Sequence, residues 1–175
     1  MLKFRFVIVS LGVATMLPLV PALRAEAPAA PLPSQILTAK KVFISNGGGG
    51  VDNNIWSGDS SRAYNEFYAA VKAWGHYVLV GSPAEADLVL QIGNSFTVVK
   101  GRTGTAVSFE PWPEIRLAFI DPKSNIILWA LDKRLELFEI GFQKSRDKNY
   151  SDSLNSLVDN LKALTAQPAA TSNPK

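Results

Sequence analysis

Residues 62–93 determine the expected fold more strongly than any other part of the chain. Five apolar residues recur there at i, i+3, i+4, i+7 and i+10, which places them on one face of a helix. Gly75 follows, and glycine readily adopts the left-handed conformation that ends helices. Residues 76–80 are continuously apolar and predict a strand covered on both faces. At this spacing, core packing is favoured over a ligand platform for Tyr64, Phe67, Tyr68, Val71 and Trp74.

Two further apolar segments flank this unit. Residues 40–45 form a short apolar run with a basic start, which predicts the first strand. Residues 86–92 predict another strand after the turn at 81–83, with Leu88, Leu90 and Ile92 on one side. A strand, a helix and a second strand in this order make a crossover connection, so the strands at 40–45 and 76–80 are expected to be parallel.

The region 95–113 allows two interpretations. Residues 97–99 and 105–107 are the strands of a hairpin around 101–104, or the whole region is a long excursion without regular structure. In either case Pro111 and Pro113 hold the chain extended on both sides of Trp112. Trp112 is then expected to stand exposed.

The C-terminal part predicts two strands and a helix. Residues 115–119 alternate, 121–125 make a turn, and 127–137 alternate again. After a polar loop at 141–149, helical periodicity starts at Tyr150 or Ser151 and continues to Leu164. The predicted fold is therefore α+β: a single two-layer domain at 39–165, with two helices packed on a mixed sheet of five to six strands.

The first 25 residues have the layout of a secretory signal peptide. Lys3 and Arg5 precede an apolar run at 6–23, and Ala25 is a small residue at the expected cleavage position. A retained membrane anchor is the alternative, because the run is nearly long enough to span a bilayer. Residues 26–38 read as a Pro/Ala-rich linker, and 166–175 as a disordered tail. The protein is expected to be periplasmic or extracellular.

Charge and cysteine content narrow the expected partners. The chain carries 18 basic and 15 acidic residues and has no cysteine. Removal of Lys3, Arg5 and Arg24 with the signal peptide leaves 15 of each sign, which gives no reason to expect nucleic acid as a partner. The lack of cysteine argues against a lipid anchor, disulfides and thiol chemistry. No membrane span is expected after cleavage, and envelope proteins remain as possible partners.

No catalytic grouping stands out, so an enzyme is not expected. His76 is the single histidine, and at a helix end it is better suited to interact with the helix C-terminus than to act as a base. A small hydrolase using His76 with Glu85 or Asp87 is the alternative, and it requires these side chains to converge. We expect no cofactor and no metal site, because one histidine without cysteine supplies few ligands.

Two loops are the candidate binding sites. Four glycines follow the first strand, but no Lys-Ser or Lys-Thr comes after them, so they do not form a phosphate-binding P-loop. If the chain binds a partner, we expect contacts from Trp112 and from Gly47, Gly48, Gly49 and Gly50. A small ligand bound between sheet and helices is a further alternative.

The order of these segments resembles small exported bacterial proteins. Its most specific parts are the Ala-Asp-Leu-Val-Leu segment at 86–90, and Asp121-Pro122 followed by Leu128-Trp129. The arrangement is similar to the periplasmic α+β domains of curli-secretion-like proteins, penicillin-binding-protein activators and the Tol-Pal N-terminal domain. The resemblance implies a non-enzymatic binding or assembly module of the cell envelope. The chain departs from those families in having no lipid-bearing cysteine and no recognisable channel-forming hairpins.

Overall fold

The structure is a computed structural model that describes residues 31–49, 56–103, 106–136 and 142–166. The predicted signal peptide, Gly50 and all but the first residue of the predicted tail lie outside these ranges. Among the helices of the described residues, none has the length and apolar character needed to cross a membrane.

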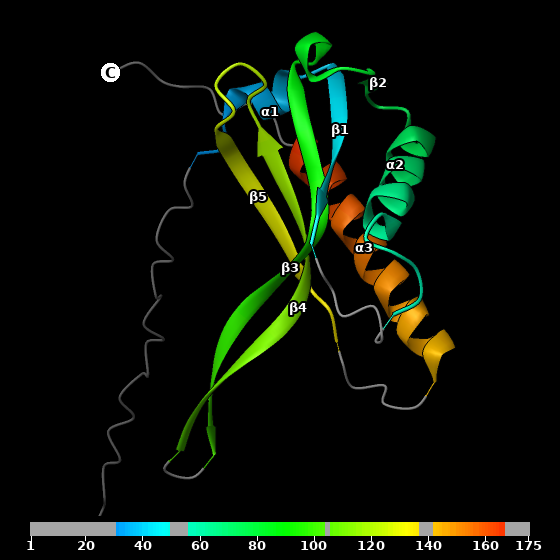
Figure 1. Cartoon of the computed structure of the whole chain (residues 1–175). Helices are drawn as coiled ribbons and strands as arrows, with labels where there is room; N and C mark the ends of the chain where they lie inside the picture. Colours follow the sequence, from blue (N-terminus) through cyan, green and yellow to red (C-terminus); the bar gives the residue numbers. More distant parts are fainter. Residues whose placement is uncertain (1–30, 50–55, 104–105, 137–141, 167–175) are drawn as a thin grey trace, which may run out of the picture. The chain divides into compact units, whose positions relative to one another are not determined.

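Five strands form one mixed sheet (Figure 1), which confirms the predicted α+β class. The strand order is β2-β1-β3-β4-β5. β1 is parallel to both β2 and β3, whereas β3 with β4 and β4 with β5 are antiparallel. The parallel pairing of β1 with β2 was expected from the crossover. The strands are β1 (Lys41–Gly48), β2 (Val78–Leu79), β3 (Leu88–Thr103), β4 (Ala106–Ile120) and β5 (Ile127–Arg134).

Two long helices, α2 (Arg62–Trp74) and α3 (Gln143–Thr165), cover one face of the sheet (Figure 1). α2 ends as predicted, because Gly75 has φ 69° and caps it in the left-handed conformation. α3 starts earlier than predicted, and residues 143–149 are helical rather than a loop. They carry no apolar stripe; instead Asp147 bonds to Ser57 and Arg62, and these tertiary contacts are not visible in the local sequence pattern.

Order also extends into the predicted linker. α1 (Ser34–Thr38) is a short third helix within residues 26–38, and its Ile36 is 1% exposed in the main core. The packed part of the chain therefore begins before Ala39. A 3-10 turn, η1 (Pro83–Glu85), precedes β3.

The core lies between the sheet and the two long helices. The helices contribute Phe67, Val71 and the leucines of α3, and each fully buried side chain stabilises the fold by about 1.5–3 kcal/mol. The aromatic stripe of α2 packs here as predicted, with Tyr64, Tyr68 and Trp74 half-buried at its margin. The sheet residues of this core include Val42, Ile44, Leu88, Leu90, Ile92, Ile115, Leu117 and Phe119.

The strand predicted at 76–80 is shorter and less covered than expected. β2 contains two residues, forms the sheet edge, and leaves Val78 60% exposed. The apolar run suggested burial on both faces, but an edge strand with one neighbour is shielded less. Tyr77, which is 7% exposed, is the residue of this run that enters the core.

β3 and β4 are much longer than their neighbours. They pair from Val89 with Ile120 to Thr103 with Ala106, whereas β1 pairs with β3 only as far as Gly93. On the other side, β5 pairs with β4 only as far as Glu114. Residues 95–103 and 106–113 therefore form a two-stranded extension, called the arm below (Figure 1). The hairpin predicted in this region is present, but its strands are continuations of core strands.

Candidate functional site

The arm continues the face of the sheet that the helices cover. Successive side chains of a strand point to opposite faces, so residues two apart share a face. On β3 the buried Leu90 and Ile92 therefore share a face with Phe96 and Val98 farther along. On β4 the same alternation runs from Ile115 back to residues 113, 111, 109 and 107. The apolar pattern of the core thus extends beyond the residues that pack against helices.

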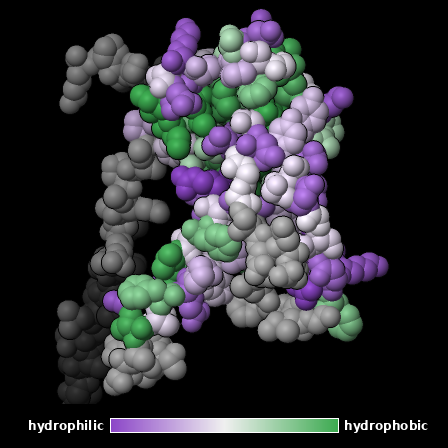
Figure 2. Space-filling view, in the orientation of Figure 1, coloured by the Kyte–Doolittle hydropathy of each residue, from purple (hydrophilic) through white to green (hydrophobic). Residues whose placement is uncertain are grey.

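The arm side chains on this face are exposed. Phe96 is 46% exposed, Val98 65%, Val107 50% and Phe109 68%, and we call these four residues the apolar arm face. Figure 2 shows hydrophobic side chains, in green, along the arm. Lys100, which pairs with Phe109, lies on the same face and interrupts this group. Exposed apolar residues gathered on one face are typical of an interaction surface.

Trp112 lies on the opposite face of the arm. It pairs with Thr97 on β3, is half-buried, and has the guanidinium carbon of Arg134 5.4 Å from its ring centroid. Trp112 is therefore not fully exposed, and Arg134 of the neighbouring strand β5 lies near its ring. Its role in binding stays a prediction.

The described glycines of the predicted binding loop pack against β3. A Cβ at Gly49, whose φ is +94°, would lie 1.8 Å from the carbonyl oxygen of Asn94. A Cβ at Gly93 would lie 2.7 Å from the oxygen of Gly48, so the two backbones approach each other closely. Gly47 and Gly93 also line a small hollow beside Arg116. This packing accounts for glycine at positions 47 and 49, whereas at Gly48 the positive φ of 64° favours glycine. A binding role for the loop glycines stays a prediction.

A hydrogen bond ties α3 to the base of the arm. The hydroxyl of Tyr150 donates to Oδ1 of Asn94 over 2.8 Å, and Asn94 is the residue next to the last β1–β3 pair. The guanidinium of Arg62 lies 4.3 Å from the centroid of the Tyr150 ring. The position of the arm base is therefore coupled to both long helices.

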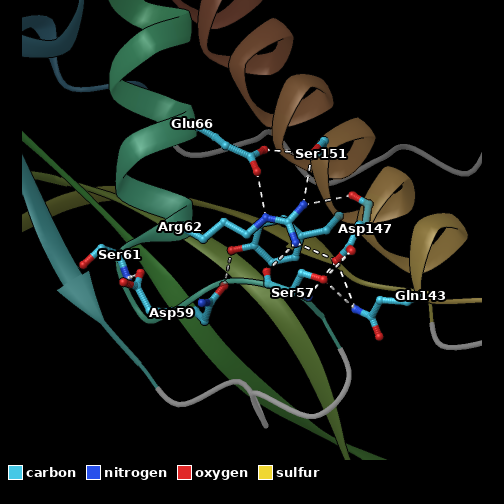
Figure 3. A network of polar contacts seen from close by, with 10 residues as sticks. Ser57, Asp59, Ser61, Arg62, Glu66, Gln143, Asp147 and Ser151 are labelled. Carbon is cyan, nitrogen blue, oxygen red and sulfur yellow. Dashed lines mark hydrogen bonds and ion pairs between the residues drawn. The ribbon is translucent and has the colours of Figure 1, made fainter.

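Arg62 is the centre of a polar network between α2, α3 and the segment before α2 (Figure 3). Its Nε donates to Glu66 over 2.7 Å and its Nη1 to Asp147 over 2.8 Å. Burial lowers the pKa of Arg62, but its bonds to Glu66 and Asp147 more than offset this and raise it. Every one of these charged groups has a partner, so we interpret the network as a structural clamp.

Asp147 is the most connected carboxylate of that network. It accepts hydrogen bonds from the amide and hydroxyl of Ser57 over 2.7 and 2.6 Å, besides that of Arg62. Burial would raise the pKa of Asp147, but these bonds to Ser57, Arg62 and Gln143 lower it to about 2. Asp147 is therefore ionised at neutral pH and holds the segment before α2 against α3.

The residues of the hydrolase alternative are engaged elsewhere. The ring of His76 stacks on Trp74, with centroids 4.6 Å apart, and meets Tyr77 edge-on. The carboxylate of Asp87 accepts from the amides of Lys40 and Lys41 over 3.0 and 2.8 Å. In the part of the chain that the structure describes, no hydrogen bond or ion pair joins His76 to Glu85 or Asp87, so the geometry offers this alternative no support.

A polar cleft of about 560 Å³ lies near the start of β1, close to the turn between β4 and β5. Gln35 bridges it by donating to the carbonyl of Asp87 and to Oδ1 of Asp121. The hydroxyl of Ser124, then Gln35 and two backbone amides, lower the pKa of Asp121 to about 2. The side chains of Gln35, Asp87 and Asp121 in this cleft are thus engaged in hydrogen bonds within the protein.

Comparisons with known proteins found remote structural matches alone. No protein-family model matches the sequence, and no curated protein matches it either. A homolog of neuraminyllactose-binding hemagglutinin from Helicobacter pylori matches at TM-score 0.40 and 12% identity, covering 74% of this chain and 87% of its own. An uncharacterized lipoprotein B from Nitrosomonas europaea matches at 0.38 and 14%, covering 81% and 90%. A minor lipoprotein from Acinetobacter baumannii matches at 0.33 and 12%, covering 75% and 93%.

At these identities and TM-scores the likenesses carry no inference about function. The three proteins are bacterial, and two of them are lipoproteins by their names. The more specific resemblance to curli-secretion-like, penicillin-binding-protein-activator and Tol-Pal domains has no matching family and stays a prediction.

Sequence reasoning did not identify the apolar arm face. The signal was present as alternation, with Phe96 and Val98 on one strand and Val107 and Phe109 on the other. The same alternation is typical of strands that pack on a core. Only the ends of β1, β5 and the helices reveal that no helix or further strand of the described residues covers these four side chains.

Proposed function

We propose that the chain is an exported, non-enzymatic binding or assembly module of the bacterial cell envelope, and that it contacts a partner protein through its arm. The observation that carries the proposal is the apolar arm face, in which four large apolar side chains on one face are 46% to 68% exposed. Burying apolar surface is the main favourable contribution to most protein–protein association. An arm with this face is suited to bind a protein surface.

The arm also offers backbone groups to a partner. Beyond Gly93 and Glu114, neither β3 nor β4 has a further strand beside it among the described residues. Unpaired strand edges can accept an added strand from another chain, which supplies main-chain hydrogen bonds. The combination of a free edge and an apolar face favours a protein over a small molecule as the partner.

The proposed location rests on the sequence. The basic start, the apolar run at 6–23 and the following Pro/Ala-rich stretch support export, and the absence of cysteine supports a chain without a lipid anchor. The balanced charge after signal cleavage supports a protein partner over nucleic acid.

Two alternatives are supported less well. The hydrolase alternative lacks a contact between His76 and Glu85 or Asp87 among the described residues. A small ligand between sheet and helices would compete with the packed core there, and the polar cleft at Gln35 has its groups bonded to each other. Thermal-shift screening with envelope metabolites tests this second alternative.

Photo-crosslinking in the native envelope tests the proposed function. A benzophenone amino acid replaces Val98 on the apolar arm face, and a matched variant carries it at Lys72 on the exposed side of α2. We expect adducts of defined mass from position 98 and none from position 72, with mass spectrometry identifying the captured protein. A chain that stays free and monomeric at both positions would overturn the proposal.

A further inference from the structure

We infer that the partner of the arm is a second copy of this chain, which pairs with it through the outer edge of β3 in antiparallel orientation. This inference rests on the proposed function and specifies its partner. It follows from a difference between the two edges of the arm.

The outer edge of β4 is blocked by proline. In an antiparallel ladder the N–H and C=O of one residue point the same way, and the direction alternates along the strand. The carbonyl of Pro113 accepts from the amide of Leu135 over 2.9 Å, so it points away from β3. By alternation, Pro111 also faces outward, and proline has no N–H to donate. Pro113 and Pro111 are the outward positions nearest the arm base. The carbonyl of Pro113 already accepts a hydrogen bond, and neither proline has an N–H to donate.

The outer edge of β3 has no such block. Phe96 pairs with Pro113 and Val98 with Pro111, so the backbone groups of Phe96 and Val98 point outward on the opposite edge. Lys100, two residues farther, continues this series. No proline occurs in residues 95–103. β1 could occupy this edge, but its pairing with β3 ends at Gly93. Three consecutive outward positions therefore present both a donor and an acceptor.

This asymmetry points to a closed dimer. Pairing of β3 with β4 of the next copy would be a heterologous contact that builds rings or open filaments, but the prolines of β4 oppose it. Pairing of β3 with the same strand of a second copy uses the open edge on both sides and closes by two-fold symmetry. The strand of the second copy is already extended, which reduces the backbone entropy lost on binding.

The charge of Lys100 favours one of two neighbouring registers. If Val98 faces Val98 of the second copy, Phe96 faces Lys100, and the two lysines lie about 13 Å apart along the strands. A shift that places Val98 opposite Lys100 would bring the lysines to about 7–8 Å. Because charges separated by more than about 8 Å are largely screened at physiological salt, the first register avoids the repulsion. It also gathers the phenylalanines and valines of both copies on one face.

Single-cysteine variants test this arrangement, because the natural chain has no cysteine. In the inferred register, residues 98 of the two copies form a hydrogen-bonded pair about 5.5 Å apart at Cα, which is within disulfide range. Val98→Cys of the purified full chain should give a covalent dimer on mild oxidation. The matched control, Glu110→Cys, places its thiol on the other strand and the other face of the arm, and should stay monomeric. No dimer from Val98→Cys, or equal dimer from both variants, would overturn the inference.

Sedimentation provides a second measurement that does not depend on oxidation. Val98→Pro removes an outward donor without removing a β3–β4 hydrogen bond, so the hairpin should remain while the dimer dissociates. We expect a dimer for the natural chain and a monomer for Val98→Pro, with unchanged far-ultraviolet circular dichroism. A natural chain that is monomeric at all concentrations would refute the inference. If position 98 captures a different protein in the envelope while Val98→Cys stays monomeric, the proposed function stands and the second copy is wrong.

Discussion

The Tyr150 hydroxyl donates a 2.8 Å hydrogen bond to Oδ1 of Asn94, and this bond fixes α3 to the point where the arm leaves the sheet. The guanidinium of Arg62 lies over the same tyrosine ring, so α2 contributes to the contact. The arm is therefore supported at its base by both helices, whereas in its far part the described strands β3 and β4 pair only with each other.

Tyr150→Phe should loosen the arm base. Removal of the hydroxyl leaves Asn94 without this donor, and we expect the free energy of unfolding to fall by about 1 kcal/mol. Urea denaturation measures the loss, and hydrogen exchange should increase in residues 94–99 more than elsewhere. Tyr68→Phe is the control, because Tyr68 has no hydroxyl hydrogen bond among the described residues. Equal effects of both variants would contradict a specific role for the Tyr150–Asn94 bond.

Asp147 should make stability depend on acid pH. Its pKa in the folded state is lowered from 3.8 to about 2. A lowered pKa contributes stability above about pH 4 that is lost as pH falls toward 2. Asp147→Asn should reduce the free energy of unfolding at pH 7 by on the order of 1 kcal/mol, after allowance for solvent screening. Chemical denaturation at pH 7 and pH 3 checks this, and the difference between variant and natural chain should shrink at pH 3.

The contribution of Glu114 to the free energy of unfolding should depend on pH in the opposite sense to that of Asp147. Its side chain is 8% exposed, and burial together with the nearby Asp132 raises its pKa above 4.5, although Arg116 and Arg134 oppose this. A raised pKa of an acid favours the folded state at low pH, and that contribution is lost as pH rises through the folded pKa. At pH 7, Glu114→Gln should therefore have a higher free energy of unfolding than the natural chain. This difference should be smaller at pH 4. A variant that is less stable at pH 7 would show that the ionised carboxylate stabilises the fold.

Gly93→Ala tests the close approach of β1 and β3. The new Cβ would lie 2.7 Å from the backbone oxygen of Gly48, so one strand must shift, at a cost of about 1–3 kcal/mol. Gly81→Ala is the matched control, since nothing lies within 4 Å of its added Cβ. Thermal unfolding should separate the two variants clearly. Similar melting temperatures would mean that the strands accommodate the methyl group.

Trp112→Ala tests which of the two faces of the arm contacts the partner. The variant loses the contact with Arg134, so we expect the free energy of unfolding to fall by about 1 kcal/mol. Photo-capture from position 98 should persist, because Trp112 lies on the face opposite Val98. Loss of capture with an intact fold would instead support the sequence prediction that Trp112 binds the partner. Collapse of the fold would assign Trp112 to the core.

Local pattern was enough to predict much of the fold. The spacing of Phe67 and Val71 and the glycine at position 75 predicted α2 and its end, because helix periodicity and the left-handed cap are properties of neighbouring residues. Alternation likewise predicted the strands around Leu90 and Leu117. The polar first turns of α3 were missed, because their partners Arg62 and Ser57 lie about 85 residues away in the sequence.

The candidate site could be recognised only from the three-dimensional arrangement. Alternating apolar residues at 96 and 98 look the same in sequence whether a helix covers them or not. Their exposure follows from where β1, β5 and the helices end relative to β3 and β4, which is a property of strand order and register. Sequence fixes which side chains share a face, because that depends on the backbone period. Which part of a face remains uncovered depends on contacts between distant segments, and only the folded chain decides it.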